Sequence, residues 1–453
     1  MKKTKQIKSF PQGGVHPPDF KLTDQKQIEN MPLPEKVAIH ISQHIGKPAN
    51  PIVKVGDKVK TGQLIAKGDG FISTNYHASI TGTVQKIEDV LDQTGYKNKA
   101  VIIKREGTTD DWIPEVDLTP AIIKDITYSS EEIRSKIYEA GIIGLGGAGF
   151  PSHVKLSVPD GKKIEFLLIN GVECEPYLTS DYRLMLEKIE QLIVGIQIIL
   201  KALDINRAII GIEANKMDAI LKLKEGAKDI PQIDVVALRV QYPQGGERQL
   251  VKALINREIP PPPKGLPIDA GCAVFNVGTV YAIYEAIQKN KPLIERIVTL
   301  TGQSLKNPSN FLVRIGTPIK DVIDQAGGLP DDSGKILSGG PMMGKALAKI
   351  EIPLAKTIGG LVIIPESQAT RNEVLECIRC GKCVSVCPLG LEPYLIMALS
   401  QKGAFDRAEQ EKILNCCECA CCSYICPSNR PLLDYIRLGK TVVNQIKRTR
   451  DTK

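Results

Sequence analysis

Two short runs near the C-terminus carry ten of the chain's 12 cysteines, and eight of the ten follow one repeated spacing. The first run is Cys377-x2-Cys380-x2-Cys383-x3-Cys387-Pro388, and the second is Cys416-x2-Cys419-x2-Cys422-x3-Cys426-Pro427. Three thiolates with this spacing can wrap a tight loop around one side of an iron–sulfur cube, and a fourth must reach it from elsewhere. Structural zinc sites instead pair two shorter cysteine units across a longer gap. The repeated spacing therefore predicts two [4Fe–4S] clusters.

The assignment of ligands follows the rule of two-cluster ferredoxins, in which the fourth cysteine of each run ligates the cluster of the other run. One cluster is expected on Cys377, Cys380, Cys383 and Cys426, and the other on Cys416, Cys419, Cys422 and Cys387. Cys417 and Cys421 are then left over, either as alternative ligands or, more simply, as spare thiols in a crowded loop. Residues 388–415 between the runs are rich in helix formers, which predicts a helical module rather than a hairpin-linked one.

A glycine-rich loop, Gly144-Leu-Gly-Gly-Ala-Gly149, satisfies the pattern G-x-G-x-x-G. The dinucleotide fingerprint needs a strand before such a loop and a helix directly after it. Here a predicted helix over 131–140 precedes the loop, and Phe150-Pro151 follows it. The pattern is therefore not a Rossmann fingerprint, although its backbone N–H groups can still bind a phosphate.

Three further polar loops follow apolar strands or lead into helices: 170–176 (NGVECEP), 244–248 (QGGER) and 275–279 (FNVGT). Open α/β sheets bind their ligands at such places, beyond the carboxyl ends of the strands. Each loop alone could be an ordinary connection. Four of them beside a cluster module predict a flavin or nucleotide site.

The elements that position these loops divide the chain into six parts. Residues 1–34 read as an extended arm, and 35–127 as short strands, including one over 78–87 with Gly82 in its middle. The stretch VKVGDKVKTGQLIAK is similar to half of a barrel-sandwich hybrid of the lipoyl type. Its hairpin at 67–70 lacks the setting of a carrier lysine, which favours a structural or docking role.

Residues 128–291 alternate strands (164–169, 207–212, 235–240) with helices, including one long helix over 181–203, which predicts a parallel α/β domain. In 292–365, two strands, a short helix ending at Gly327-Gly328 and a further strand predict a β-grasp fold. The cysteine module spans 366–430, and a basic, partly amphipathic tail spans 431–453.

Charge and hydropathy exclude several classes of function. The net charge of +8 is mild for 453 residues and forms no basic stripe with interleaved aromatics, so nucleic-acid binding is not expected. The longest apolar run, 192–200, is far shorter than the ~20 residues of a membrane span. The basic N-terminus lacks the apolar segment of a secretory signal, so the chain is expected in the cytoplasm. The basic tail either docks on an acidic protein or anionic membrane face, or is simply solvated.

Several motifs together resemble known families. GLGGAGFPSHVK, NGVECEP and FNVGT occur in the same order as similar motifs in the flavin- and NADH-binding subunit of respiratory complex I, and a β-grasp unit follows in both. The hybrid domain, the YPQGGE loop, the GGPMMG stretch and the doubled cysteine run resemble the C subunit of the Rnf electron transport complex over nearly the whole chain. The implied fold is multidomain α/β: a barrel-sandwich hybrid, an FMN/NADH-binding domain, a soluble-ligand-binding β-grasp (SLBB) domain and a helical two-cluster ferredoxin domain.

The resemblance also implies site residues. The residues expected around FMN extend from the glycine loop, which would lie at the phosphate and ring edge, to the two asparagine loops. They are Gly144, Gly146, Gly147, Lys155, Asn170, Glu173, Asn276 and Thr279. Phe150 would stack on the nicotinamide nucleotide, and Glu175 and Glu247 would contact it. Leu145 and Val172 stand where complex I has an arginine and an aspartate, so the flavin contacts there are open.

The implied function is that of a peripheral subunit, on the cytoplasmic side of the membrane, of an ion-translocating ferredoxin:NAD oxidoreductase. Its partners would be other subunits of the complex, an iron–sulfur donor or acceptor, and NAD(H). Clusters carry single electrons and NADH exchanges a hydride, so FMN is expected between them, with no side chain acting as a catalytic acid or base. Two alternatives stay open: a soluble flavin/iron–sulfur cobalamin reductase, and an electron-wire subunit without flavin.

Overall fold

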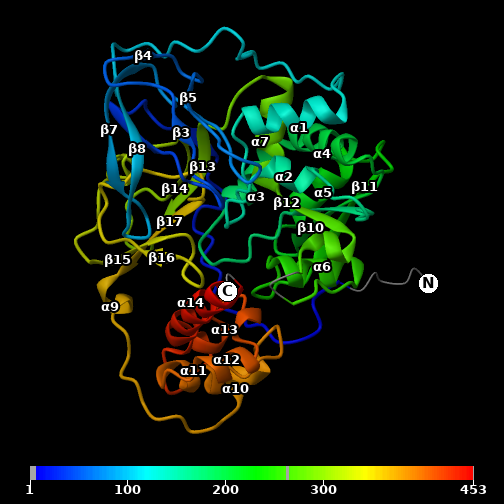
Figure 1. The fold of residues 1–453 in the computed structure, drawn as a ribbon, viewed down its shortest axis with the longest axis vertical. Helices are drawn as coiled ribbons and strands as arrows, with labels where there is room; N and C mark the ends of the chain where they lie inside the picture. Colours follow the sequence, from blue (N-terminus) through cyan, green and yellow to red (C-terminus); the bar gives the residue numbers. More distant parts are fainter. Residues whose placement is uncertain (1–6, 262–264, 452–453) are drawn as a thin grey trace.

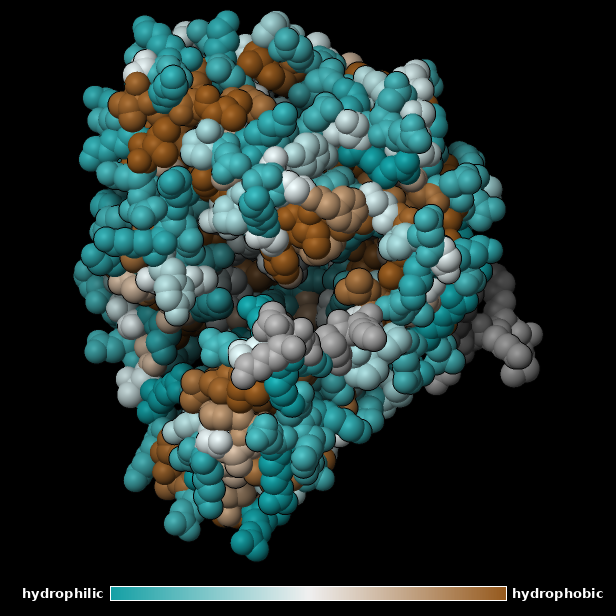
Figure 2. Space-filling model, viewed as in Figure 1, coloured by the Kyte–Doolittle hydropathy of each residue, from teal (hydrophilic) through white to brown (hydrophobic). Residues whose placement is uncertain are grey.

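The computed structural model describes residues 7–261 and 265–451. Figure 1 shows a β-rich part and an α/β part side by side, with the helical C-terminal part below them. Figure 2 shows a largely hydrophilic face that is hollowed near its centre, between these parts. No helix within the described ranges is long and apolar enough to cross a membrane.

The first β-rich unit consists of two small sheets. Strands β2 (Lys36–His40), β8 (Lys97–Arg105), β7 (Gly82–Leu91) and β4 (Lys58–Val59) form one, and β3 (Asn50–Pro51), β5 (Leu64–Lys67) and β6 (Tyr76–His77) form the other. Their core is aliphatic and includes the fully buried Ile39, Ile65 and Ile103. The predicted strand over 78–87 is wrong in its bounds, because Gly82 begins β7. A side chain at Gly82 would collide with the backbone of Lys104 on β8.

The α/β unit contains a parallel four-stranded sheet of order β11–β10–β9–β12, as predicted. Its strands are β9 (Phe166–Asn170), β10 (Ala208–Glu213), β11 (Ile233–Leu238) and β12 (Cys272–Asn276), each within two residues of the prediction where one was made. The helices that accompany it are α1 (Ser130–Glu139), α2 (Ser152–Leu156), α5 (Met217–Gly226), α6 (Glu247–Ile255) and α7 (Val277–Gln288), with a 3-10 turn η1 (Pro267–Ala270).

The single long helix predicted over 181–203 is two helices, α3 (Ser180–Glu187) and α4 (Ile189–Leu203). The helical conformation breaks at Lys188, where φ is −128° and ψ is 39°. The two pieces pack on different neighbours, since α3 contacts β13 (Glu295–Thr301) of the next unit whereas α4 contacts α1. The residues around the break, Glu187-Lys188-Ile189-Glu190, are mostly charged, but all of them are compatible with a helix, so their types did not indicate it.

The second β-rich unit has a six-stranded sheet of order β1–β14–β13–β17–β15–β16. Its strands are β1 (Ile28–Asn30), β13 (Glu295–Thr301), β14 (Ser309–Arg314), β15 (Ser333–Ser338), β16 (Lys345–Ala346) and β17 (Gly360–Pro365). Helix α8 (Ile319–Gln325) ends at Gly327 and Gly328, which both adopt positive φ, as the sequence predicts. Strand β1 comes from the N-terminal arm (described from residue 7 to 34), so the arm packs on the rest of the chain as expected.

The C-terminal unit is helical. Its elements are α9 (Glu366–Ala369), α10 (Lys382–Ser385), α11 (Pro393–Gln401), α12 (Phe405–Gln410), η2 (Ile413–Asn415), α13 (Cys421–Tyr424) and α14 (Leu432–Asp451). Within the described residues, the basic tail is thus the helix α14, which packs on α11 through buried side chains such as Ile436.

Candidate functional site

The polar loops of the α/β unit meet at the carboxyl edge of its sheet. Strands β9 and β12 are parallel neighbours, and Asn170 pairs in register with Asn276 at their ends. The Leu145 N–H donates to Thr279 Oγ1 at 2.9 Å, which joins the glycine loop to the start of α7. The Asn170 amide donates to the Gly245 carbonyl at 2.9 Å, which joins the other two loops. The structure therefore brings all four predicted loops together.

The glycine loop leaves an open surface. Gly147 has φ +144°, and a Cβ built there would meet nothing within 4 Å. Gly146 is pressed against Asn276, whose Cβ would lie 3.0 Å from an added methyl group. Below the loop, the Lys155 ammonium lies 3.9 Å from the Cβ position of Gly144. Exposed backbone beside a cation suits a phosphate-bearing planar ligand, so these residues fit FMN.

Lys155 donates to the Val274 carbonyl at 3.0 Å. Burial lowers the pKa of Lys155, and the nearby charge of Glu247 opposes this shift. Glu247 itself begins α6. Phe150 is half-buried at the end of the glycine loop, and its carbonyl accepts from the Gly144 N–H. These three predicted residues thus lie around one edge of the loop.

Asn276 caps α7, since its side-chain oxygen accepts from the Gly278 N–H at 2.8 Å. Its amide donates to Asp181 of α3 at 2.6 Å. Burial and the nearby charge of Glu173 raise the pKa of Asp181 to about 7. A cavity of about 40 Å³, lined by residues that include Asp181, Asn276 and Arg296, lies beside this pair. Sequence reasoning missed Asp181, which belongs to no motif.

The turn after β9 uses its acidic side chains to hold the backbone. The Glu173 carboxylate accepts from the N–H groups of Asp181 at 2.7 Å and Tyr182 at 3.1 Å, and so caps the start of α3. The Glu175 carboxylate accepts from the N–H groups of Met342 at 3.0 Å and Met343 at 2.8 Å in the GGPMMG stretch. Burial raises the pKa of Glu175 to about 7. The flavin and nucleotide contacts expected of both residues stay predictions.

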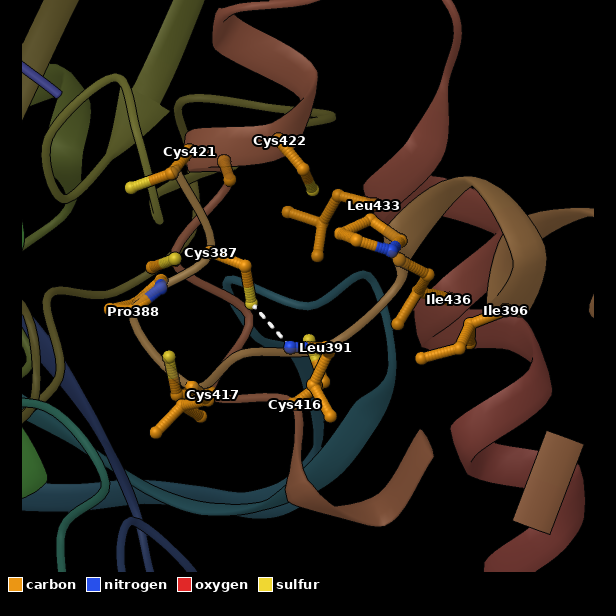
Figure 3. Close-up of a pocket in the computed structure, with 14 residues that line it drawn as sticks. Cys387, Pro388, Leu391, Ile396, Cys416, Cys417, Cys421, Cys422, Leu433 and Ile436 are labelled. Carbon is orange, nitrogen blue, oxygen red and sulfur yellow. Dashed lines mark hydrogen bonds between the residues drawn. The ribbon is translucent and has the colours of Figure 1, made fainter. Parts of the chain in front are cut away.

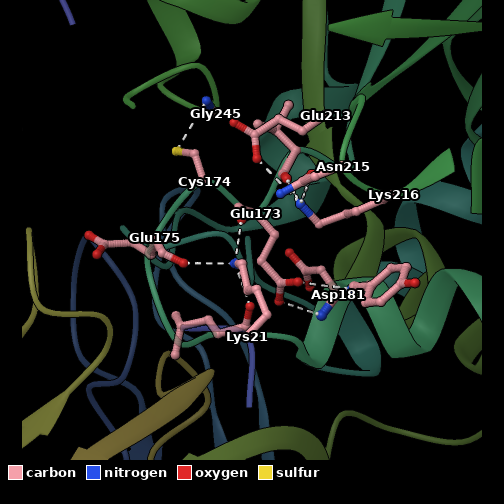
Figure 4. Close-up of polar contacts among 12 residues, drawn as sticks. Lys21, Glu173, Cys174, Glu175, Asp181, Glu213, Asn215, Lys216 and Gly245 are labelled. Atoms are coloured by element: carbon pink, nitrogen blue, oxygen red, sulfur yellow. Dashed lines mark hydrogen bonds and ion pairs between the residues drawn. The ribbon is translucent and has the colours of Figure 1, made fainter. Parts of the chain in front are cut away.

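Two lysines that sequence reasoning did not single out donate to carbonyls of this turn (Figure 4). Lys21 of the arm donates to the carbonyls of Glu173, Glu175 and Leu178 at 3.0, 2.9 and 2.7 Å. Lys216, at the start of α5, donates to the Val172 carbonyl at 2.8 Å. No sequence signal marks Lys21, because the arm is irregular.

The two departures from the complex I pattern have a structural reason. Leu145 and Val172 are buried in separate apolar clusters of the α/β unit. The Leu145 carbonyl accepts from the buried guanidinium of Arg296 on β13, at 2.7 Å. The second β-rich unit thus supplies a cation beneath the glycine loop.

Four of the predicted cluster ligands converge. Cys387 of the first run and Cys416, Cys419 and Cys422 of the second line one cavity, together with Cys417 and Cys421 (Figure 3). Apolar side chains, including Ile396 and Ile436, close the cavity on the helical side. A four-iron cluster needs thiolates spread around a cube in a largely apolar shell, so this donor set fits one. Single-ion sites are a different matter: within 7–261 and 265–451, no three His, Cys, Asp or Glu side chains are placed to hold one metal ion.

The other four ligands lie differently. Cys377 and Cys380 are exposed, Cys383 and Cys426 are half-buried, and the Cys383 side chain belongs to the periphery of the same helical core as Cys426. The charge of Cys426 contributes to raising the pKa of Cys383, after burial. These two cysteines, from different runs, are therefore close, as the cross-run assignment expects. Their common cluster stays a prediction.

Comparison with family models gives three matches in the predicted order. Residues 8–108 match the RnfC barrel sandwich hybrid domain, 137–285 match the Nuo51 FMN-binding domain, and 297–346 match the SLBB domain. These matches confirm the first three kinds of domain and their order. The finer bounds, and the ferredoxin character of the cysteine module, stay predictions.

Curated relatives identify the family. The chain is 45% identical over 406 residues to the C subunit of the proton-translocating ferredoxin:NAD(+) oxidoreductase complex of Clostridium ljungdahlii, covering 89% of this chain and 87% of the relative. The chain belongs to the RnfC family, the C subunits of ion-translocating ferredoxin:NAD(+) oxidoreductase complexes. The C subunit of the Na(+)-translocating complex of Acetobacterium woodii is 41% identical, with 94% of this chain and 96% of the relative covered. The resemblance found in the sequence is thereby confirmed.

Among solved structures, an NAD+-reducing [NiFe]-hydrogenase in the air-oxidized state matches with a TM-score of 0.47 at 18% identity, covering 73% of this chain and 57% of the hydrogenase chain.

Proposed function

We propose that this member of the RnfC family passes electrons between iron–sulfur partners and NAD through FMN, as part of an ion-translocating ferredoxin:NAD oxidoreductase complex. One observation carries the proposal. The cysteine-lined cavity and the loops of the FMN-binding unit share one apolar cluster, made of Val15, Tyr242, Met342, Cys419 and Cys421. A cluster site and a flavin site that share a wall are close neighbours, which favours electron exchange between them.

The flavin would lie on the glycine loop. Gly144, Gly146 and Gly147 present backbone without side chains, Lys155 supplies the positive charge for a phosphate, and Asn276 and Thr279 hold the loop and the start of α7 together. The N-terminus of α7 adds a partial positive charge at the same place. Asn170 and Glu173 fix the opposite turn. When bound, FMN supplies the conversion between a hydride and single electrons.

NAD(H) would approach from the open side of the glycine loop. Phe150 offers a ring for stacking at the end of the loop, and Glu175 and Glu247 lie on the two neighbouring loops. The protein's part is to hold the nicotinamide against the flavin, which is a matter of orientation rather than acid–base chemistry. We therefore assign no catalytic acid or base.

Two [4Fe–4S] clusters would continue the path. We place one on Cys387, Cys416, Cys419 and Cys422, which share a cavity, and the other on Cys377, Cys380, Cys383 and Cys426. The second site includes the exposed Cys377 and Cys380, so it is the natural exit toward an iron–sulfur partner. The division into an arm (1–34), a hybrid domain (35–127), an FMN/NADH domain (128–291), a β-grasp domain (292–365), a ferredoxin domain (366–430) and a tail (431–453) is part of this proposal.

We also propose that the chain binds peripherally on the cytoplasmic side of the membrane through other subunits. In support, the described ranges hold no helix suited to a membrane span, and the relatives are subunits of larger complexes. Those relatives favour this function over a cobalamin reductase. An electron-wire subunit without flavin is distinguished by the following experiment.

The test is anaerobic reconstitution of the full chain with iron, sulfide and FMN. We expect about eight irons and one flavin per chain, and formation of NADH when the chemically reduced protein meets NAD+. Protein that binds iron but no flavin would support the electron-wire alternative. Colourless protein that binds zinc in place of iron would refute the proposal.

A further inference from the structure

The N-terminal arm crosses the junction between the cysteine module and the FMN-binding unit. At one end, the Gly14 N–H donates to the Val386 carbonyl at 2.9 Å, directly before Cys387. Gly13 has φ +72°, and a Cβ there would lie 2.6 Å from the backbone carbon of Cys387. The Gln241 amide donates to the Gly13 carbonyl at 2.6 Å. The arm therefore touches the backbone of a proposed cluster ligand, and only glycine fits there.

The next residues of the arm reach the YPQGGE loop. Val15 and Tyr242 exchange both backbone hydrogen bonds, at 2.8 and 2.9 Å, like a short piece of antiparallel sheet. Tyr242 is almost fully buried and packs in the same apolar cluster as Cys419 and Cys421. Further along this loop, Gly245 donates its N–H to the Cys174 thiol at 3.3 Å, in the turn after β9. The YPQGGE loop thus contacts the arm, the second cysteine run and the proposed flavin turn.

The arm then holds that turn through Lys21 (Figure 4). Its ammonium gathers three carbonyls of the turn, at Glu173, Glu175 and Leu178. The turn contains two residues in the left-handed region, Glu173 at φ 49° and Tyr177 at φ 71°, which points several carbonyls inward. The Tyr177 N–H donates to the Asp19 carbonyl of the arm at 2.8 Å. Through these hydrogen bonds the arm supports both the proposed flavin turn and the loop at Cys387.

We propose that the arm is the strap that sets the gap between the flavin turn and the cluster held by Cys387, Cys416, Cys419 and Cys422, with Gly13 and Lys21 as positioning residues for electron transfer. This inference rests on the proposed function. Electron transfer falls steeply with distance, so a displacement of the cysteine loop at Cys387 slows it while leaving hydride exchange at the glycine loop unchanged. This arrangement also gives the order of the electron-transfer path. The cluster of the second run comes next to the flavin, and the cluster of Cys377 and Cys380 lies further out.

The decisive variant is Gly13→Ala, with Gly107→Ala as its matched control. The two glycines have nearly the same φ, +72° and +70°, but Gly107 has nothing within 4 Å of its Cβ position. Both variants carry the same backbone strain, and only Gly13→Ala pushes against Cys387. Gln241→Ala is a second variant, which removes one anchor of the arm without adding an atom.

The full chain is loaded with FMN and iron–sulfur clusters, reduced with titanium(III) citrate and mixed with NAD+. A fully reduced chain holds a hydride on the flavin and one electron on each cluster, so it converts two NAD+ to two NADH and takes up one proton when the cluster electrons refill the flavin. The first NADH uses the flavin electrons, and the second waits for the clusters to refill the flavin. We expect Gly13→Ala to slow reoxidation of the clusters about tenfold and to leave the first phase unchanged, with Gln241→Ala slowed less and Gly107→Ala not at all.

A second readout needs no cofactor. In the full chain before loading, amide hydrogen exchange at Gly14, Val15 and Tyr242 should be faster in Gly13→Ala than in Gly107→Ala. If Gly13→Ala binds flavin and iron fully and reoxidises its clusters at the control rate, the proposal is overturned. If Gly13→Ala loses iron, an unchanged rate in Gln241→Ala overturns it instead. A parent chain that forms no NADH would refute the proposed function rather than the role of the arm.

Discussion

At the scale of residues, the candidate flavin site is built from groups whose charge is set by burial. Asp181, Glu175 and Lys155 all have pKa values moved toward the neutral form, chiefly by burial. Such shifts cluster at functional sites but also occur in structural networks. Here Asp181 holds Asn276, and Glu175 holds the GGPMMG stretch. These acids act as supports for the loops, which agrees with a reaction that needs no acid or base.

Asp181→Asn should stabilise the protein above neutral pH. The folded chain holds the Asp181 proton more tightly than the unfolded chain, with a pKa of about 7 against an ordinary 3.8. The stability that this group contributes is therefore complete below its ordinary pKa and is lost as the pH rises through about 7. At pH 8 we expect Asp181→Asn to raise the free energy of unfolding by roughly 2 kcal/mol. Thermal melts should show the gain shrinking between pH 8 and pH 5.5, and a gain that grows toward acid pH would contradict the assignment.

Asn276→Ala should weaken flavin binding. The change removes the cap of α7 and the bond to Asp181 at the place where the FMN phosphate is proposed. We expect the affinity for FMN, measured by fluorescence titration, to fall about tenfold or more. Ser129→Ala is the matched control, since it removes the cap of α1 elsewhere in the same unit. Flavin retained at full affinity after Asn276→Ala combined with Gly147→Trp would exclude the site.

At the scale of elements, local sequence chemistry predicted several boundaries correctly. Ser129 and Glu132 form a reciprocal capping box at the start of α1, which begins one residue before the predicted helix over 131–140. At the other end of a helix, Gly327 and Gly328 adopt positive φ directly after α8, where the sequence predicted its end. The break at Lys188 was not predicted, and the two helices on either side of it have different tertiary neighbours, β13 for α3 and α1 for α4. Elements whose ends are decided by tertiary contacts escape sequence rules.

Ser129→Ala should lower the stability of the chain by about 1 kcal/mol through loss of the α1 cap. The Ser129 hydroxyl accepts from the Glu132 N–H, so its removal leaves that donor without its protein partner. Glu131→Gln, in the same exposed turn, keeps the cap and should change stability less. Chemical denaturation followed by circular dichroism compares the two. Equal effects would show that the cap contributes nothing.

At the scale of the whole molecule, function depends on contacts between units far apart in the sequence. Arg296 of the second β-rich unit donates to the glycine loop, and Lys21 of the arm to the turn after β9. Cys387 and the second run meet in one cavity. The expected ligands of each site lie within one unit, but other units support them, so we expect the separated parts to bind their cofactors poorly.

The cross-run ligand assignment predicts how cysteine losses combine. Cys387→Ala should reduce bound iron from about eight to about four per chain, because it disables the cluster of the second run. Adding Cys416→Ala should then remove little more iron, whereas adding Cys380→Ala should remove most of the rest. Cys272→Ala, at a buried cysteine of β12, is the control that keeps all the iron. Iron analysis after anaerobic reconstitution gives the counts, and the reverse pattern would assign Cys387 to the first run.

The chemistry of this protein could be read from its linear sequence. Several features are recognisable from residues close together in the chain. They are the spacing of the cysteine ligands, the glycine loop, the asparagine turns and the order of the units. What joins them became visible only in the folded chain: the arm beneath the turn, the guanidinium beneath the glycine loop, the break between α3 and α4, and the wall shared by Tyr242 and the second cysteine run. Most of these features pair residues more than a hundred positions apart, and their side chains have partners of no particular type. Many of these partners are backbone carbonyls. Because every residue has one, the residue type does not indicate which carbonyl will accept such a hydrogen bond.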